Sequence, residues 1–137
     1  MTQEARWGGR VHELSIEECH EQLVSCSVGR LAFIDDDGPL ILPVNFTVVE
    51  GAVVFRTSAH NTIASHVNGK VVAFEVDDVD DFLQVGWSVL VRGRAHFAES
   101  VHDIPADRRP TPWAEGIRSL LVQISIDSVS GRRVLPS

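Results

Sequence analysis

The sequence is poor in cysteine and has no long apolar run. Its 137 residues include two cysteines, Cys19 and Cys26, without a CxxC pair or a Cys/His spacing typical of a metal site. On a helix they would share one face two turns apart, too far for an easy disulfide, so we interpret both as small buried apolar residues. The first 15 residues lack the apolar segment of a signal peptide, and Pro43 and Asn45 break the longest apolar stretch, 40–49. We therefore expect a cytoplasmic protein without a membrane span or a metal site.

Positive charge is also scarce. The formal net charge is −7, and the basic residues are eleven arginines and one lysine, Lys70, with no basic run. A chain of this charge is repelled by phosphate backbones and anionic membranes, which argues against nucleic-acid or membrane partners. Apolar residues make up 44% and charged residues 23%, a globular composition at the length of one domain. We assign residues 1–13 to a flexible lead-in and 14–137 to a single domain.

The sequence predicts a mainly β fold with two short helices. Ser15 and Glu18 form a capping-box pattern before a helix over 16–26, whose apolar face would carry Ile16, Cys19, Leu23 and Cys26. A second short helix is predicted over 59–67. Strands are predicted over 30–34, 40–49, 52–56, 70–76, 85–98 (bent at Gly93) and 120–126, whereas 77–81 reads as a solvated turn, 99–118 as irregular and 128–134 as a tail. About six antiparallel strands joined by short turns favour a closed or partly closed barrel.

Residues 56–62 are the first candidate binding segment. A predicted strand ends at Arg56, hydroxyls follow at Thr57 and Ser58, and a helix then begins. A guanidinium, hydroxyls and helix-start amides together suit a phosphate group. The alternative is that Ser58 or Asn61 only caps the helix while Arg56 pairs with a surface acid. The residues alone leave both interpretations open.

Two further segments have residue types suited to a planar ligand. Pro43-Val44-Asn45 interrupts a strand, and a proline belongs on a strand edge, where backbone groups stay available. Gly86 permits close approach beside the large aromatic Trp87. The alternatives are an ordinary irregularity of the barrel edge and a tryptophan that packs in the core or an interface.

Taken in order, these segments resemble a known family. The chain is similar to the flavin-binding split-barrel proteins of the pyridoxamine 5'-phosphate oxidase-like class, in its short bacterial "type 2" branch. The resemblance rests on Gly29-Arg30-Leu31-Ala32, Pro43-Val44-Asn45-Phe46, Phe55-Arg56-Thr57, Phe74-Glu75-Val76-Asp77, Gly86-Trp87-Ser88-Val89, Val91-Arg92-Gly93-Arg94-Ala95, Pro112-Trp113 and Gly131-Arg132-Arg133, and it covers nearly all of residues 14–134.

The resemblance implies FMN bound at the interface of a homodimer. The residues matching Arg56 and Thr57 would hold the phosphate, with Ser58 and Thr62 beside them, and Pro43, Val44 and Asn45 would run along the ring. The residues matching Trp87 and Trp113 would lie near the cofactor, in part from the second subunit. One departure is that Thr62 stands where the family usually has a lysine, which removes a positive charge from the phosphate site.

The expected function is that of a flavin-dependent oxidoreductase acting on a small organic molecule with an electron donor. No acid–base pair stands out, so no catalytic residue is assigned; in such enzymes the cofactor carries the electrons. The substrate would meet the loops 77–86 and 99–118. The alternatives are a deazaflavin-dependent reductase of the same fold, which the loss of the lysine mildly favours, and a non-catalytic module that binds flavin or haem or no cofactor. The histidines are scattered, and His60 and His66 lack the four-residue spacing of paired metal ligands on a helix.

Overall fold

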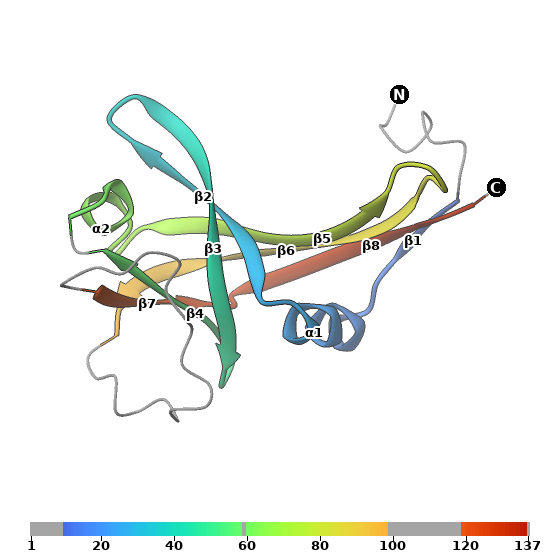
Figure 1. The fold of residues 1–137 in the computed structure, drawn as a ribbon. Helices are drawn as coiled ribbons and strands as arrows, with labels where there is room; N and C mark the ends of the chain where they lie inside the picture. Colours follow the sequence, from blue (N-terminus) through green and yellow to red (C-terminus); the bar gives the residue numbers. More distant parts are fainter. Residues whose placement is uncertain (1–9, 59, 99–118, 137) are drawn as a thin grey trace.

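The fold is a long, twisted antiparallel sheet that curls into a barrel at one end. The computed structural model describes residues 10–58, 60–98 and 119–136. Its elements in chain order are β1 (Arg10–Glu13), α1 (Ile16–Ser25), β2 (Val28–Asp35), β3 (Gly38–Val49), β4 (Ala52–Ser58), α2 (Thr62–His66), β5 (Val71–Asp80), β6 (Val85–Phe97), β7 (Ser119–Ser125) and β8 (Ser128–Leu135). Figure 1 shows β5 and β6 crossing the whole molecule, with α2, β4 and β7 at one end and the β5–β6 hairpin at the other, and β8 running beside β6 from the middle of the molecule to the hairpin end.

Six of the strands close the barrel. The sheet order is β1-β8-β6-β5-β2-β3-β4-β7, and an additional pairing of β6 with β7 completes the ring. One edge of β6 is therefore shared, because Gly86–Arg92 pair with β8 and Ala95–Phe97 pair with β7. The change of partner falls at Gly93, the predicted bend, where a β-carbon would lie 1.5 Å from the carbonyl oxygen of Ser125. Only glycine allows the strands to cross this closely.

The core fills the barrel and continues beneath α1. Its fully buried side chains include Phe55, Phe74, Val89 and Val91 from the barrel and Leu23 from α1. The predicted capping box is present, since the Glu18 amide donates to Ser15 Oγ at 3.1 Å and the Ser15 amide to the Glu18 carboxylate at 2.9 Å. The predicted apolar face is correct for Cys19 and Leu23 but wrong for Ile16, which is 69% exposed.

The sequence interpretation missed strand at three places. Arg10–Glu13, which we assigned to the lead-in, form β1, and residues 128–134, taken as a tail, form most of β8. β5 continues through the acidic segment to Asp80, so the predicted turn over 77–81 is wrong for all but its last residue. All three are strands of the extension beyond the barrel, where exposed positions are polar and the apolar alternation is weak. Residues 1–9 and 99–118 lie outside the described residues. No helix in the described part of the chain is long and apolar enough to span a membrane.

Candidate functional site

The candidate site begins where β3 and β4 separate. Residues 38–45 of β3 pair with β2, whereas the pairing of β3 with β4 starts only at Phe46, opposite Phe55. Among the described strands, Gly38 to Asn45 therefore have a ladder on one side only. Pro43 is exposed on this stretch, and its missing amide proton is compatible with such an edge. The prediction of an edge strand around Pro43 is confirmed.

The side chains of this stretch point to opposite faces. Val44 is 6% exposed and belongs to the core, so only its backbone is available beside a ligand. Pro43 and Asn45 lie on the outer face, because successive side chains of a strand alternate. Continuing the register of Phe46 with Phe55 sets Asn45 across from Arg56 on that same face.

Arg56 supplies the positive charge at this place. It lies on β4 opposite Leu121 of β7, and it is half-buried with its Nε atom fully buried. Ser58, two residues further, shares its face and is exposed at the end of the strand. Asn45, Arg56 and Ser58 thus offer an amide, a guanidinium and a hydroxyl on one outer surface. This donor set suits a phosphate dianion, for which charge-assisted hydrogen bonds from arginine are among the strongest available.

Thr57 points the other way. It is 7% exposed, and its hydroxyl accepts a hydrogen bond from the side-chain amide of Asn61. The carbonyl oxygen of the same Asn61 side chain accepts from the Ala64 amide at 3.0 Å and caps α2. Thr57 therefore ties α2 to the barrel, and its role at a phosphate stays a prediction. Because α2 is a single turn of five residues, it offers few free amides.

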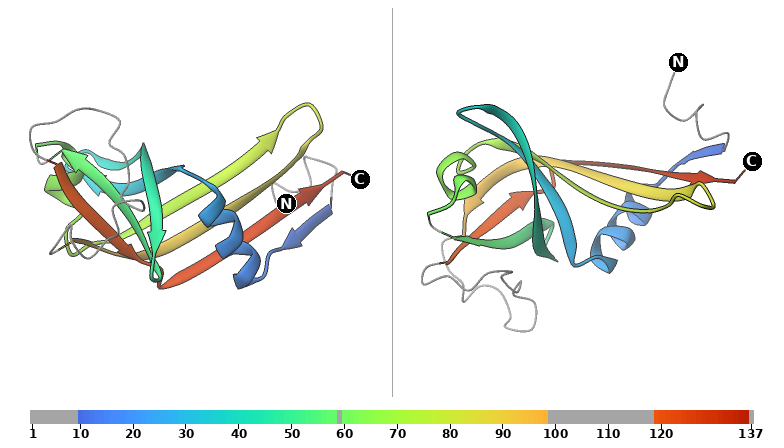
Figure 2. Two further views of the ribbon diagram at one scale, coloured as in Figure 1. Left: turned by 60° about the horizontal axis from the view of Figure 1, so that its bottom comes forward. Right: turned by 45° about the horizontal axis from the view of Figure 1, so that its top comes forward.

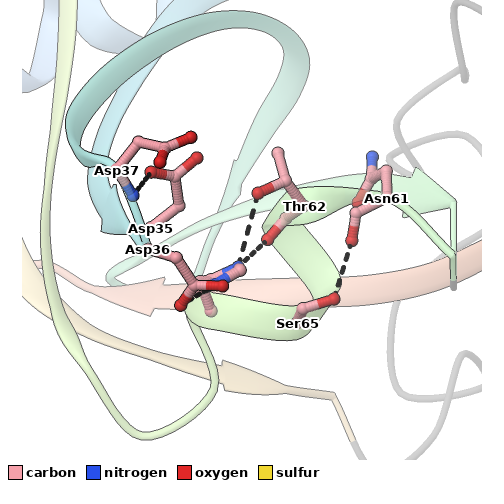
Figure 3. A network of polar contacts seen from close by, with 7 residues as sticks. Asp35, Asp36, Asp37, Asn61, Thr62 and Ser65 are labelled. Carbon is pink, nitrogen blue, oxygen red and sulfur yellow. Dashed lines mark hydrogen bonds and ion pairs between the residues drawn. The ribbon is translucent and has the colours of Figure 1, made fainter.

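Thr62, at the position where the resemblance expects lysine, belongs to a separate polar network. His66 Nδ1 donates to the Thr62 carbonyl oxygen at 2.8 Å and lies 3.3 Å from the Thr62 hydroxyl. Its other ring nitrogen lies 3.4 Å from the carboxylate of Asp36, in the turn between β2 and β3. The hydrogen bond to the Thr62 carbonyl, followed by the hydrogen bond and charge of Asp36, raises the pKa of His66. Figure 3 shows Thr62 turned towards this turn and Asn61 turned away from it.

Trp87 lies far from this surface within one copy of the chain. It is partly buried against the core near the start of β6. The Arg56 region lies at the other end of β6: Phe97, ten residues after Trp87, pairs with Val122, which is next to Leu121, the residue opposite Arg56. Ten strand residues span roughly 33 Å. One copy therefore does not bring Trp87 and Arg56 together. Trp113 lies outside the described residues.

A charged cluster that sequence reasoning missed lies on the same outer face. Arg30 of β2 donates to Glu75 at 3.1 Å and to Asp77 at 2.9 Å, both on β5. Burial, followed by the hydrogen bond and charge of Asp77, raises the pKa of Glu75 to about 7, against the lowering effect of Arg30. The two sequence segments with Arg30 and with Glu75 were noted only as parts of the resemblance, and their pairing across β2 and β5 gives no local signal.

Comparisons with known proteins agree with this fold. A family model described as pyridoxamine 5'-phosphate oxidase matches residues 15–133. An uncharacterized Mycobacterium tuberculosis protein, Rv0080, is 34% identical over 131 residues, which cover 91% of this chain and 86% of that protein.

Two solved structures are similar over nearly their whole length. A candidate pyridoxamine 5'-phosphate oxidase from Corynebacterium glutamicum is 35% identical with a TM-score of 0.76, over 92% of this chain and 100% of that one. An FAD-binding protein from Mycobacterium smegmatis is 31% identical with a TM-score of 0.71, over 90% of this chain and 98% of that one. With this coverage, the chain belongs to the pyridoxamine 5'-phosphate oxidase family and has the split-barrel fold.

Proposed function

We propose that the protein is a flavin-dependent oxidoreductase of a small organic molecule, with FMN held between two copies of the chain. The observation that carries the proposal is the outer surface formed by Asn45, Arg56 and Ser58 at the point where β3 leaves β4. The similarity to an FAD-binding protein from M. smegmatis supports a flavin, since FMN and FAD share the ring and the first phosphate.

The proposed chemistry belongs to the cofactor. A bound flavin would supply hydride or electron transfer, and the chain would position and shield it. Arg56 and Ser58 would hold the phosphate, while the edge of β3 at Pro43 and Asn45 would lie along the ring. The residues present fit these roles. The edge of β3 at Pro43 and Asn45 pairs with no second described strand, which leaves room for the ring, and Arg56 supplies positive charge to the phosphate although no lysine stands beside it.

The distance along β6 supports a site shared by two copies. Trp87 lies roughly 33 Å along the strand from the Arg56 region in its own copy, so a contribution of Trp87 to the flavin site would come from a second copy. In a homodimer in which each site takes Trp87 from the partner copy, Arg56 could hold the phosphate and Trp87 could still lie near the cofactor.

A second candidate is a deazaflavin-dependent reductase. Thr62 carries no charge, and its hydroxyl contacts His66. The phosphate site of this chain therefore depends on Arg56 for positive charge more than a site with the usual lysine would. A cofactor with a longer anionic tail would be less dependent on Arg56, because it could make contacts away from the phosphate site.

The visible absorption spectrum of the purified protein, followed by titration with FMN and with FAD, tests the proposal. A flavin spectrum or saturable uptake is expected. Arg56→Ala should weaken uptake by about 10- to 100-fold, the equivalent of one charge-assisted hydrogen bond. Arg10→Ala, which removes an exposed arginine on the edge strand β1, is the matched control and should leave uptake unchanged.

Equal affinity in Arg56→Ala would remove the phosphate-site assignment. A colourless protein that binds neither flavin would overturn the flavin proposal and move the test to a deazaflavin. Reduction of the bound flavin by a nicotinamide donor and reoxidation by an acceptor would support an enzyme, whereas a flavin that turns over with neither would support a binding module.

A further inference from the structure

The end of the β2–β3 hairpin, by which we mean residues 33–40, projects beyond the rest of the sheet. Among the described strands, β5 pairs with β2 only at residues 30–32, and β4 pairs with β3 only from Phe46 onward. Residues 33–40 therefore pair with one another and with no third described strand. Phe33 anchors this hairpin end in the core, and Figure 2 shows it next to α2 at the barrel end of the molecule.

α2 connects the hairpin end to the phosphate side of the candidate site. The N-terminal end of α2 is tied to β4, because the side-chain amide of Asn61 donates to the Thr57 hydroxyl. The C-terminal end reaches the hairpin through His66, whose Nε2 atom lies 3.4 Å from the carboxylate of Asp36. In the part of the chain that the structure describes, this is the only side-chain hydrogen bond from the hairpin end to another element.

The geometry around His66 requires a protonated ring. Nδ1 lies 2.8 Å from the carbonyl oxygen of Thr62, and Nε2 faces the carboxylate of Asp36, so both ring nitrogens face acceptors. A neutral imidazole donates from one nitrogen only, whereas the imidazolium donates from both. The two contacts are therefore complete together only in the charged form.

The charges around the ring favour the same form. The hydrogen bond to Thr62, followed by the hydrogen bond and charge of Asp36 and the charge of Asp35, raises the pKa of His66 from 6.5, against the lowering effect of burial. β4, the other strand that contacts α2, carries one charged residue, Arg56, whose charge does not shift this pKa. By linkage, the contact with Asp36 is complete below about pH 6.5 and is lost as the pH rises through the raised pKa.

We propose that His66 is a positioning residue for the flavin, and that its contact with Asp36 fixes the gap between the ring edge on β3 and the phosphate donors on β4. The inference rests on the proposed function for the identity of the ligand. The ring edge at Pro43 lies on the strand that leaves the hairpin end, whereas Arg56 and Ser58 lie on the strand that leads to α2. A hairpin end held against α2 keeps these two parts in one arrangement, so less ordering is left for the flavin to impose when it binds.

The expected effect is small because the contact lies near the surface. The side chain of His66 is 24% exposed and that of Asp36 is 96% exposed. Exposed ion pairs of this kind contribute little, and their range corresponds to a change in affinity of roughly two- to fivefold. The test therefore depends on comparing matched variants at the same pH.

The role of His66 is tested by titrating FMN into cofactor-free protein at pH 6 and at pH 9. His66→Gln should bind FMN about two- to fivefold more weakly than the wild type at pH 6 and about equally at pH 9. The ratio of the two constants at one pH cancels the titration of the phosphate of FMN itself, which falls near pH 6. His96→Gln, which changes an exposed histidine on β6, is the control and should match the wild type at both values. An equal loss for His66→Gln at pH 6 and pH 9 would mean a purely structural role and would overturn the proposal.

The partner of His66 is tested with a double-mutant cycle at pH 6. Asp36→Asn should weaken FMN binding as much as His66→Gln, and the double variant should be no weaker than either single variant. Asp37→Asn, which changes the neighbouring acid of the same turn, is the matched control and should bind FMN like the wild type. Additive losses would show that the two side chains act independently and would overturn the contact as the cause.

Amide hydrogen exchange of residues 33–40 in the cofactor-free protein keeps this proposal apart from the proposed function. At pH 6 these amides should exchange about two- to fivefold faster in His66→Gln than in the wild type, and equal rates would overturn the contact. Flavin uptake with equal affinities in the two proteins would overturn the positioning role and leave the proposed function intact. Faster exchange in His66→Gln, in a protein that takes up no flavin at either pH, would support the contact and overturn the proposed function.

Discussion

Replacing Gly29 by alanine should destabilise the protein through one identifiable clash. A β-carbon at Gly29 would lie 2.2 Å from Cζ of the Phe74 ring. The ring is fully buried and is held on another side by an edge contact with Phe46, with 4.7 Å between centroids. Overpacking of this kind costs about 1 to 3 kcal/mol, and we expect the upper half of that range because the ring has little room to move.

A double-mutant cycle makes the reasoning refutable. Phe74→Leu alone should cost about 1 to 2 kcal/mol through the cavity it leaves. Because the shorter side chain removes the clash, Gly29→Ala should cost at least 1 kcal/mol less in the Phe74→Leu background. The free energies of unfolding come from urea titrations at constant m-value. Strict additivity, or a Gly29→Ala variant within 0.5 kcal/mol of the wild type, would show that the ring does not limit this position.

Three further outcomes are expected. Asn61→Ala should cost about 1 to 2 kcal/mol in urea unfolding, because it removes the cap of α2 and the bond to Thr57, whereas Asn61→Asp, which keeps the cap, should cost less. Leu23→Ala should cost about 2 to 5 kcal/mol in the same assay, since this side chain is 1% exposed and anchors α1. The raised pKa of His66 means that its stabilising effect is complete below about pH 6.5 and is lost as the pH rises through the folded-state value; His66→Gln should remove that part of the pH dependence of the melting temperature, and an unchanged profile would contradict it.

Local signals made the helices and the barrel strands predictable. The capping box fixed the start of α1, and the alternation in β6, together with Gly93, indicated one long strand that bends. The strands β1 and β8 were missed because they pair outside the barrel, where one face of the sheet is exposed. Polar residues on that face, such as Arg132, give these strands a composition typical of loops. The acidic end of β5 was predicted as a turn for the same reason.

The candidate site was predictable only as a set of residue types. Arg56 and Thr57 are neighbours in sequence, yet they point to opposite faces, and Thr57 is committed to Asn61. Which of two adjacent strand residues faces a ligand depends on register, and register is set by distant pairings. The pairing of Arg30 with Glu75 across β2 and β5 is non-local in the same way, so a carboxyl with a pKa of about 7 leaves no trace in the sequence.

The shared edge of β6 has a consequence for the order in which the chain folds. β7 closes the barrel between β4 and β6, and β8 continues at once along the remainder of the same edge, so residues 119–135 complete both parts of the sheet. Until that segment has left the ribosome, β4 and one edge of β6 lack their partners, and the nascent chain exposes two open sheet edges. Closure then joins residues far apart in sequence, which makes it a slow step. The segment that forms β7 and β8 therefore decides whether the barrel closes or its open edges pair with another chain.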